Sequence, residues 1–390
     1  MWITRLKLKN WRNFKQIDVA LRDRVYLIGP NASGKSNLLD VFRFLRDIAK
    51  TSGGGLQKAV KDRHGITKLR CLQARTDPEV AIEVELASAL DDSVAEWSYA
   101  IGFKSEGKGQ QRLLLNYERV WQRDTLVLNR PDAADQADIA RLTQTHLEQI
   151  NANAGFRPIA DFFTGVTYLH LVPQLLKYSD DIGGKHLEDD PFGQGFFERI
   201  ARCPPRTRDA RLKRIQSALQ KAVPQFKELR FVTDKVNGHP HLEAFYEHWR
   251  PNAGWQREEQ FSDGTLRLLA LLWSLLEGDS LLLLEEPELS LNDALVEQIP
   301  LLLDRLQRQA RYRRQILLST HSEALLRNPG IDVRGVLRLE PDKEGTRIVA
   351  PDESEQRLVE NGLSPAEVLL SKTRSVRFDQ VDLFKSTTPP

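Results

Sequence analysis

The stretch Gly29-Pro30-Asn31-Ala32-Ser33-Gly34-Lys35-Ser36 decides the fold. It matches the pattern Gly-x-x-x-x-Gly-Lys-Ser/Thr in full, after the apolar run Val25–Ile28 and before a helical pattern over 36–50. A glycine-containing loop in this position brings backbone N–H groups and a helix N-terminus up to phosphate. Lys35 can reach the β- and γ-phosphates of a nucleoside triphosphate, and the Ser36 hydroxyl can bind Mg²⁺. We therefore predict an ATP- and Mg²⁺-binding loop made of Gly29, Pro30, Asn31, Ala32, Ser33, Gly34, Lys35, Ser36 and Asn37.

A second signal is the run Leu281–Leu284, which ends in Glu285-Glu286-Pro287-Glu288. A central parallel strand is buried on both faces and reads as a continuous apolar run. Residues at its C-terminal end face the crevice where open α/β sheets bind ligands. We predict that Glu285 binds Mg²⁺ and that Glu286 orients or deprotonates the attacking water. Acids here can also cap the next helix, and Glu288 fits a surface role equally well.

The rest of the chain carries period-two and helical patterns. Apolar and polar residues alternate over 80–86, 97–103 and 113–128, which predicts antiparallel strands. Apolar residues recur at helical spacing between 139 and 150 and predict a helix there. After Phe261, helix-like and strand-like runs alternate, as in a parallel sheet with right-handed crossovers.

These patterns divide the 390 residues into three parts. We expect an N-terminal lobe over 1–174, an inserted segment of mixed and helical character over 175–260, and a C-terminal lobe over 261–390. The fold class is α/β, with a central, mainly parallel sheet flanked by helices and an antiparallel β lobe beside it.

Composition narrows the setting. A formal net charge of +2 points to neither a nucleic-acid nor a membrane partner. Cys71 and Cys203 form no Cys-x-x-Cys pair, which favours a reducing cytosol and no structural zinc. The longest apolar stretch, 266–276, falls short of the ~20 residues needed to cross a bilayer. We expect a cytoplasmic protein without a membrane partner.

Taken together, these residues resemble the ABC-type ATPases, in the variant found in RecF-like and SMC-like AAA family ATPases. The motifs occur in the family's order: Val172-Pro173-Gln174 resembles the Q-loop, Phe261–Arg267 the signature motif, Glu285–Glu288 the Walker B motif, and Leu317–Ser322 the strand and switch histidine. The segments 53–165 and 175–260 match only in general character.

The resemblance implies a head-to-tail homodimer in which the signature motif of one copy closes over the γ-phosphate held by the other. Ser262 and Gly264 would contact that nucleotide, with Asp263 in a place often held by glycine. Gln174 would sense Mg²⁺ and the γ-phosphate, and His321 would hold the γ-phosphate. From the residues alone, Ser262 fits a helix N-cap and His321 a structural histidine.

Two departures from the family pattern bear on activity. The first Walker B acid is usually aspartate, and here it is Glu285, which is compatible with slow hydrolysis. Ala32 replaces a common glycine of the loop, a mild change if its backbone needs no positive φ.

The resemblance further implies an ATP-hydrolysing conformational switch in DNA repair, chromosome maintenance or antiphage defence. A low-turnover ATP-binding module that regulates a separate effector, such as a nuclease or toxin, is the alternative. A transporter subunit and a small-molecule kinase are weaker alternatives. DNA stays open as a partner because two basic clusters, over 206–214 and 305–314, could contact its backbone, although solvated faces explain them better.

Overall fold

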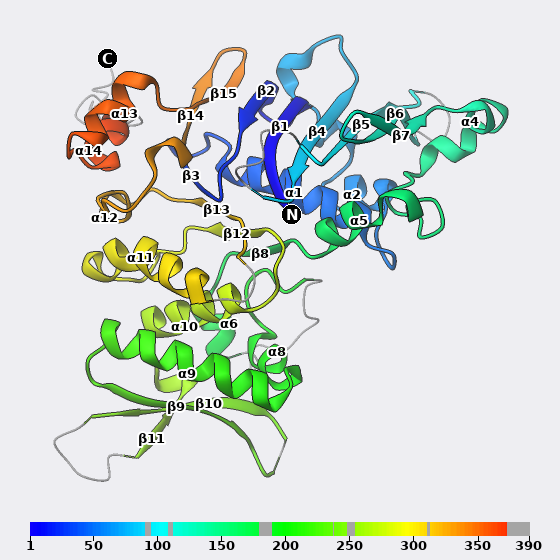
Figure 1. The fold of residues 1–390 in the computed structure, drawn as a ribbon. Coiled ribbons are helices and arrows are strands. Elements are labelled where there is room, and N and C mark those ends of the chain that lie inside the picture. The colour runs from blue at the N-terminus through cyan, green and yellow to red at the C-terminus, as the bar shows by residue number, and fades with distance from the viewer. Residues whose placement is uncertain are drawn as a thin grey trace, which may run out of the picture.

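The computed structural model describes residues 1–89, 95–107, 112–178, 189–236, 238–247, 254–309 and 313–372, and its strands form three sheets (Figure 1). Sheet A is antiparallel, in the order β2 (Phe14–Ala20), β1 (Trp2–Trp11), β4 (Val80–Ala87), β5 (Trp97–Ser105), β6 (Leu113–Gln122) and β7 (Thr125–Arg130). Sheet B has the order β15 (Gly345–Val349), β14 (Val336–Asp342), β3 (Arg24–Ile28), β13 (Ile316–Ser319), β12 (Leu282–Glu285) and β8 (Thr167–Leu169). Sheet C is formed by β11 (Trp255–Arg257), β10 (Pro240–Tyr246) and β9 (Phe226–Thr233).

Sheet B is the central layer and separates two hydrophobic cores. All its strands except β15 run parallel to their neighbours, as the alternating pattern predicts. Successive residues point to opposite faces of a strand, so Leu283 joins one core and Leu282 and Leu284 join the other. The same alternation holds in β3 and β13, which explains why these strands read as continuous apolar runs.

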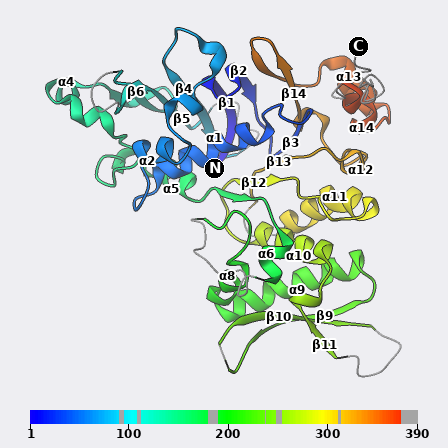
Figure 2. The same ribbon diagram turned by 180° about the vertical axis from the view of Figure 1, so that it is seen from behind.

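The helices cover both faces of sheet B. On one side, α1 (Lys35–Ala49) and α5 (Arg157–Thr164) contribute to the core shared with sheet A. On the other side lie α10 (Asp263–Leu276), α11 (Asp293–Gln309) and α9 (Pro205–Ala222), with sheet C beyond them (Figure 2). The short helices α6 (Pro173–Lys177) and α8 (Phe196–Arg202) lie on the same side.

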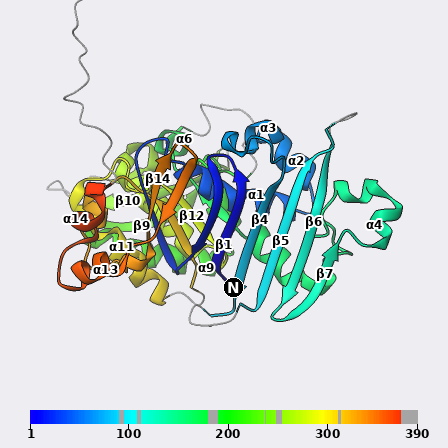
Figure 3. The same ribbon diagram turned by 90° about the horizontal axis from the view of Figure 1, so that it is seen from above.

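The remaining helices are short and lie at the edges. They are α2 (Leu56–Lys61), α3 (Ile66–Leu69), α4 (Ala133–Ala137), α12 (Glu323–Leu326), α13 (Glu353–Glu360) and α14 (Pro365–Leu369). From above, the strands of sheet A run side by side, with α4 at one end of the molecule and α13 and α14 at the other (Figure 3). In the part of the chain described, no helix has the length and apolar character needed to cross a membrane. The predicted fold class is confirmed.

The helix predicted between 139 and 150 is wrong. The structure has a short 3₁₀ turn at Ile139–Thr143, followed by irregular turns, and Ile139 and Ile150 are exposed. Buried side chains replace the helical hydrogen bonds: Arg130 donates to the carbonyls of residues 141 and 144, and Glu118 accepts from the backbone N–H groups of residues 146 and 147. A buried charged pair on the neighbouring strands β6 and β7 therefore overrides the local helical period.

Sheet C was not predicted, because 175–260 reads as polar and mixed. Its strands bury few apolar side chains, such as Leu242 and Ala244, and these join the hydrophobic core that also contains α9 and α10. The strand predicted over 166–172 is shorter, since β8 ends at Leu169. The division at 174 and 260 stays a prediction; both outer parts contribute strands to sheet B.

Candidate nucleotide site

The predicted phosphate-binding loop connects β3 to α1, as the sequence indicates. Gly34 has a φ of 102°, and a Cβ atom added there would lie 2.1 Å from Asn13 Nδ2. Gly29 has a φ of 156°, and its added Cβ would lie 2.6 Å from the Leu339 carbonyl oxygen. Only glycine fits these two positions, because either side chain would collide with a neighbouring element.

A cluster of polar side chains beneath the loop holds it in place. Asn13 Nδ2 donates to the Ser33 carbonyl oxygen at 2.8 Å, and Thr346 Oγ1 donates to the same oxygen at 2.9 Å. Asn37, predicted to contact the cofactor, donates its side-chain amide to Asn13 Oδ1 at 2.8 Å. Sequence reasoning missed Asn13 and Thr346, because neither belongs to a motif and both act through tertiary contacts.

Lys35 lies in the mouth of the loop. Its Nζ donates to the carbonyl oxygens of Gly29 and Pro30, at 3.0 and 3.1 Å. Burial lowers the pKa of Lys35, and the carboxylates of Glu286 and Glu285 oppose that shift. The ammonium group is therefore held by two carbonyl oxygens of the loop and within the field of these acids.

Ser36 and Glu285, two of the three residues predicted to act at the Mg²⁺ ion, are in direct contact, whereas the third, Gln174, contacts Asp263. The Ser36 hydroxyl donates to one oxygen of Glu285, and the Tyr168 hydroxyl donates to the other. Burial, followed by the charge of Glu285, raises the pKa of Tyr168, so its phenol stays protonated at neutral pH. A hydroxyl and a carboxylate are the oxygen ligands that Mg²⁺ prefers, so this donor set fits the ion. Tyr168, from β8, was not foreseen.

Glu286 and His321 lie on neighbouring loops at the end of sheet B. Glu286 has a φ of 43°, its N–H donates to the Ser319 carbonyl at 3.1 Å, and its Oε1 lies 3.4 Å from His321 Nε2. Burial, then the charge of Lys35, lowers the pKa of His321, while Glu286 acts in the opposite direction. The imidazole is therefore neutral at neutral pH.

Glu288 is buried, so its surface alternative is wrong. Its Oε1 accepts hydrogen bonds from Thr320 Oγ1 at 2.5 Å and from the His321 N–H at 3.2 Å. Burial raises the pKa of Glu288, although these donors oppose the shift. Glu288 therefore orients the loop that carries His321.

One cavity of 390 Å³ collects most of the predicted site residues: Asn31, Ala32, Ser33, Gly34, Lys35, Ser36, Asn37, Glu285, Glu286 and His321. Gly29 and Pro30 approach it through their carbonyl contacts with Lys35. Sequence segments more than 200 residues apart thus converge at the C-terminal ends of β3, β12 and β13.

The predicted signature residues and Gln174 do not line this cavity within the described chain. Ser262 is exposed and caps α10, because its Oγ accepts from the Thr265 N–H at 3.1 Å. Gln174 Nε2 donates to Asp263 Oδ2 at 2.7 Å. A Cβ atom at Gly264 would lie 2.8 Å from the Ser290 carbonyl oxygen, so glycine allows the loop between β12 and α11 to approach α10 closely. Their roles toward a nucleotide stay predictions.

Several residues of the two basic clusters are used in packing. The guanidinium of Arg208 lies 4.0 Å from the Phe231 ring centre, and that of Arg211 lies 5.3 Å from the Trp273 ring. Arg314 is buried and donates to the carbonyl oxygens of Ser280 and Ser274. These contacts account for Arg208, Arg211 and Arg314 without DNA, and the burial of Arg314 corrects the expectation of a solvated face at that position. Arg311 lies outside the described residues.

Ala32 has a φ of 61°, so the condition for a mild substitution is not met. A non-glycine residue in this left-handed region of the backbone lowers the free energy of unfolding by about 1–2 kcal/mol. Glycine relieves that strain, but its greater conformational entropy in the unfolded chain offsets about 0.5–1 kcal/mol of the gain. We expect Ala32→Gly to raise the free energy of unfolding by about 0.5 kcal/mol in urea titrations without nucleotide. The control Ala210→Gly, at an exposed position in α9, should lower it by about 1 kcal/mol. Equal losses in both variants would contradict the strain argument.

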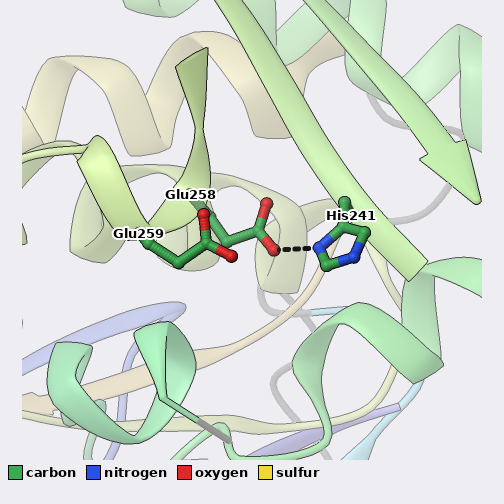
Figure 4. A group of neighbouring side chains, drawn as sticks. All are labelled: His241, Glu258 and Glu259. Carbon is green, nitrogen blue, oxygen red and sulfur yellow. Dashed lines mark hydrogen bonds and ion pairs between the residues drawn. The ribbon is translucent and has the colours of Figure 1, made fainter. Parts of the chain in front are cut away.

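Outside the cavity, the side chains of His241, Glu258 and Glu259 lie close together and are of the types that bind metal ions (Figure 4). His241 Nδ1 lies 2.6 Å from Glu258 Oε1, and the Leu242 N–H donates to Glu258 Oε2 at 3.0 Å. Both oxygens of this buried carboxylate thus have protein partners, whereas Glu259 is exposed. The group joins β10 to the turn before the signature motif and needs no ion to be satisfied.

Comparisons with known proteins show a family and a fold that this chain shares. Residues 25–327 match the family model described as "AAA domain, putative AbiEii toxin, Type IV TA system". The DNA replication and repair protein RecF of Roseiflexus castenholzii is 29% identical over 103 residues, which are 24% of this chain and 26% of that protein. The match thus spans about a quarter of the length of this curated relative.

Two solved structures share the fold. The Smc head bound to the C-winged helix domain of ScpA has a TM-score of 0.56 at 16% identity, over 91% of this chain and 99% of that one. The Smc head with an extended coiled coil, bound to the C-terminal domain of ScpA derived from Pyrococcus furiosus, has a TM-score of 0.50 at 15% identity, over 92% and 99%. The fold of this chain is therefore that of an ABC/SMC/RecF-like ATPase head. Since the family model covers most of the chain, the chain belongs to the AAA domain family that this model describes.

Proposed function

We propose that the protein binds ATP and Mg²⁺ in the cavity at Gly29–Ser36 and hydrolyses the nucleotide between two head-to-tail copies of the chain. The observation that carries this proposal is the contact of Ser36 with Glu285 in a cavity that also contains Lys35, Glu286 and His321. A hydroxyl, a carboxylate, an ammonium and a candidate general base in one cavity are the groups that phosphoryl transfer to water requires.

Each side chain has a chemical task in this proposal. The loop amides and Lys35 hold the β- and γ-phosphates, and Mg²⁺, bound by Ser36 and Glu285, would neutralise developing charge on the phosphate oxygens. Glu286 accepts a proton from the attacking water. His321, neutral because its pKa is lowered, donates an N–H to a γ-phosphate oxygen and holds it in line with that water.

The involvement of a second copy is supported by the position of the signature motif, which lies outside the cavity of its own chain. Ser262 is exposed at the N-terminus of α10, and none of the described signature residues lines the chain's own cavity. The N-terminus of α10, a helix of 14 residues with serine as its N-cap and glycine as its second residue, is suited to bind phosphate. A head-to-tail arrangement would bring this edge over the triphosphate of the twin and exclude water from it.

A composite site predicts complementation between two inactive variants. Ser262→Arg should lower hydrolysis about 100-fold or more, because the side chain blocks the edge that meets the twin's nucleotide. Lys35→Ala should be inactive for lack of bound ATP. Mixed in equal amounts, they should recover about a quarter of the wild-type rate, since half the dimers are mixed and each has one intact site of two.

Phosphate release is the measurement for this mixture, and each variant mixed with itself is the control. If Ser262→Arg alone turned over like the wild type, the site would be complete within one chain. If the mixture stayed as inactive as its components, the two copies would not share their sites in this way.

A second candidate, an ATP-binding module with little turnover, has one observation in its favour. The hydroxyls of Ser36 and Tyr168 donate hydrogen bonds to both oxygens of Glu285, which replaces the usual, shorter aspartate. Both carboxylate oxygens are therefore already hydrogen-bonded before any ion binds. Phosphate release from Tyr168→Phe distinguishes the candidates: faster turnover than the wild type would support Tyr168 as a restraint on Glu285. An unchanged rate would leave hydrolysis as the better reading.

The cellular setting we propose is a switch for DNA maintenance or antiphage defence that acts through DNA or a separate effector such as a nuclease or toxin. The support is the kinship of this chain: part of it is similar to a DNA replication and repair protein, and its family description mentions a toxin system. Phosphate release measured with and without duplex DNA tests the first of these partners.

A further inference from the structure

The signature edge, formed by Ser262, Asp263 and Gly264 at the N-terminus of α10, carries a negative charge where it would meet a phosphate. Asp263 lies between Ser262 and Gly264 in the first turn of α10, with 34% of its side chain exposed. If this edge closes over the twin's triphosphate, as the proposed function requires, an uncompensated carboxylate would repel the phosphate oxygens. Glycine at this position avoids that cost, so a chain with aspartate needs a compensating group.

Two side chains of α6 engage both oxygens of this carboxylate. Lys177 Nζ lies 2.7 Å from Asp263 Oδ1, and Gln174 Nε2 donates to Oδ2 at 2.7 Å. The Lys177 side chain is only 13% exposed, so its ammonium is held at this contact rather than dispersed in solvent. The carboxylate is therefore paired and turned towards α6.

Helix stability does not account for this arrangement. Ser262 already caps α10 by accepting from the Thr265 N–H. An aspartate in the first turn is also favourable without a partner, because it faces the positive end of the helix dipole. A partly exposed ion pair adds little to the free energy of unfolding. The pair formed by Lys177 and Asp263 therefore matters most where α10 approaches the second copy of the chain.

We propose that Lys177 is the counter-ion of the signature motif. It neutralises Asp263 and holds the carboxylate back, so that the Ser262 and Gly264 edge can approach the triphosphate of a second copy. Lys177 is a positioning residue: it touches no reacting atom and acts through Asp263. This inference rests on the proposed function and adds a requirement for charge balance at the shared site.

The test measures ATP-dependent dimerisation in the Glu286→Gln background, where hydrolysis does not consume the closed state. Lys177→Met keeps the length of the side chain but removes its charge. We expect the dimer dissociation constant in ATP to rise about 10- to 100-fold. The reason is that the unpaired carboxylate of Asp263 then faces the triphosphate of the second copy in a partly desolvated interface. Binding of a fluorescent ATP analogue to the monomer should not change, since Lys177 is not among the residues that line the cavity.

Two further variants separate charge from structure. Lys177→Met combined with Asp263→Asn should recover most of the lost dimerisation, because no carboxylate remains to be neutralised. Lys221→Met, at an exposed lysine of α9, is the matched control and should leave the dimer unchanged. The defect of Lys177→Met should also shrink in high salt, where charge repulsion is screened.

The outcomes are distinguishable. If the parent Glu286→Gln protein forms no dimer in ATP, the proposed function fails. If it dimerises and Lys177→Met dimerises equally well, only the counter-ion role is overturned. If Asp263→Asn brings no recovery to Lys177→Met, Lys177 acts by packing α6 against α10 and the inference is also wrong.

Discussion

Replacing Glu286 by glutamine is expected to lower the rate of ATP hydrolysis by about 10²–10⁴-fold, the usual contribution of a general base. Glutamine keeps the shape of the side chain but cannot accept a proton from water. The backbone N–H of Glu286 donates to Ser319, and its carboxylate faces His321, so the substitution leaves the position of the group unchanged.

ATP affinity should persist in Glu286→Gln, and the protein should accumulate as a closed dimer because the step that opens it is blocked. Single-turnover phosphate release and light scattering with and without ATP measure the two effects. Glu259→Gln, which removes an exposed acid outside the cavity, is the control. A variant that hydrolyses ATP at the wild-type rate would remove Glu286 from the mechanism.

The second large effect is expected from Lys35→Ala, which should weaken ATP binding by about 10²–10³-fold. Charge-assisted contacts to two phosphates are lost, and no other cation among the residues lining the cavity can replace them. The loop itself should persist, because Asn13 and Thr346 hold its Ser33 carbonyl independently of Lys35.

Calorimetric titration with ATP and Mg²⁺ measures this loss, and thermal unfolding provides a second readout. Saturating ATP should raise the melting temperature of the wild type but not that of Lys35→Ala. Lys15→Ala is a suitable control, since Lys15 is exposed and pairs with Glu344. Equal affinity in Lys35→Ala and the wild type would show that the nucleotide binds elsewhere.

Patterns with a local physical cause were predictable. The loop at Gly29–Ser36 follows from backbone requirements within eight residues, and the register of apolar residues in β3, β12 and β13 follows from burial on both faces. The order of strands and helices after Phe261 then places Glu285, Glu286 and His321 at one edge of the sheet.

Other features depend on contacts that no local pattern encodes. The failed helix at 139–150 is held open by Arg130 and Glu118, which lie on strands of sheet A. Tyr168 meets Glu285 across 117 residues of sequence, and Glu288 reaches the loop of His321 across 33. No local pattern distinguishes these residues, because each acts through a partner that only the fold brings close.

By itself, the sequence determined the phosphate loop, the acidic strand end and the class of fold, because these depend on backbone geometry and on periodic burial over a few residues. Only the tertiary structure decided that Thr346 fastens the loop from 313 residues away and that Lys177 pairs with Asp263. Such contacts are made between side chains whose distance is set by the packing of whole layers, so they emerge only when both cores have formed.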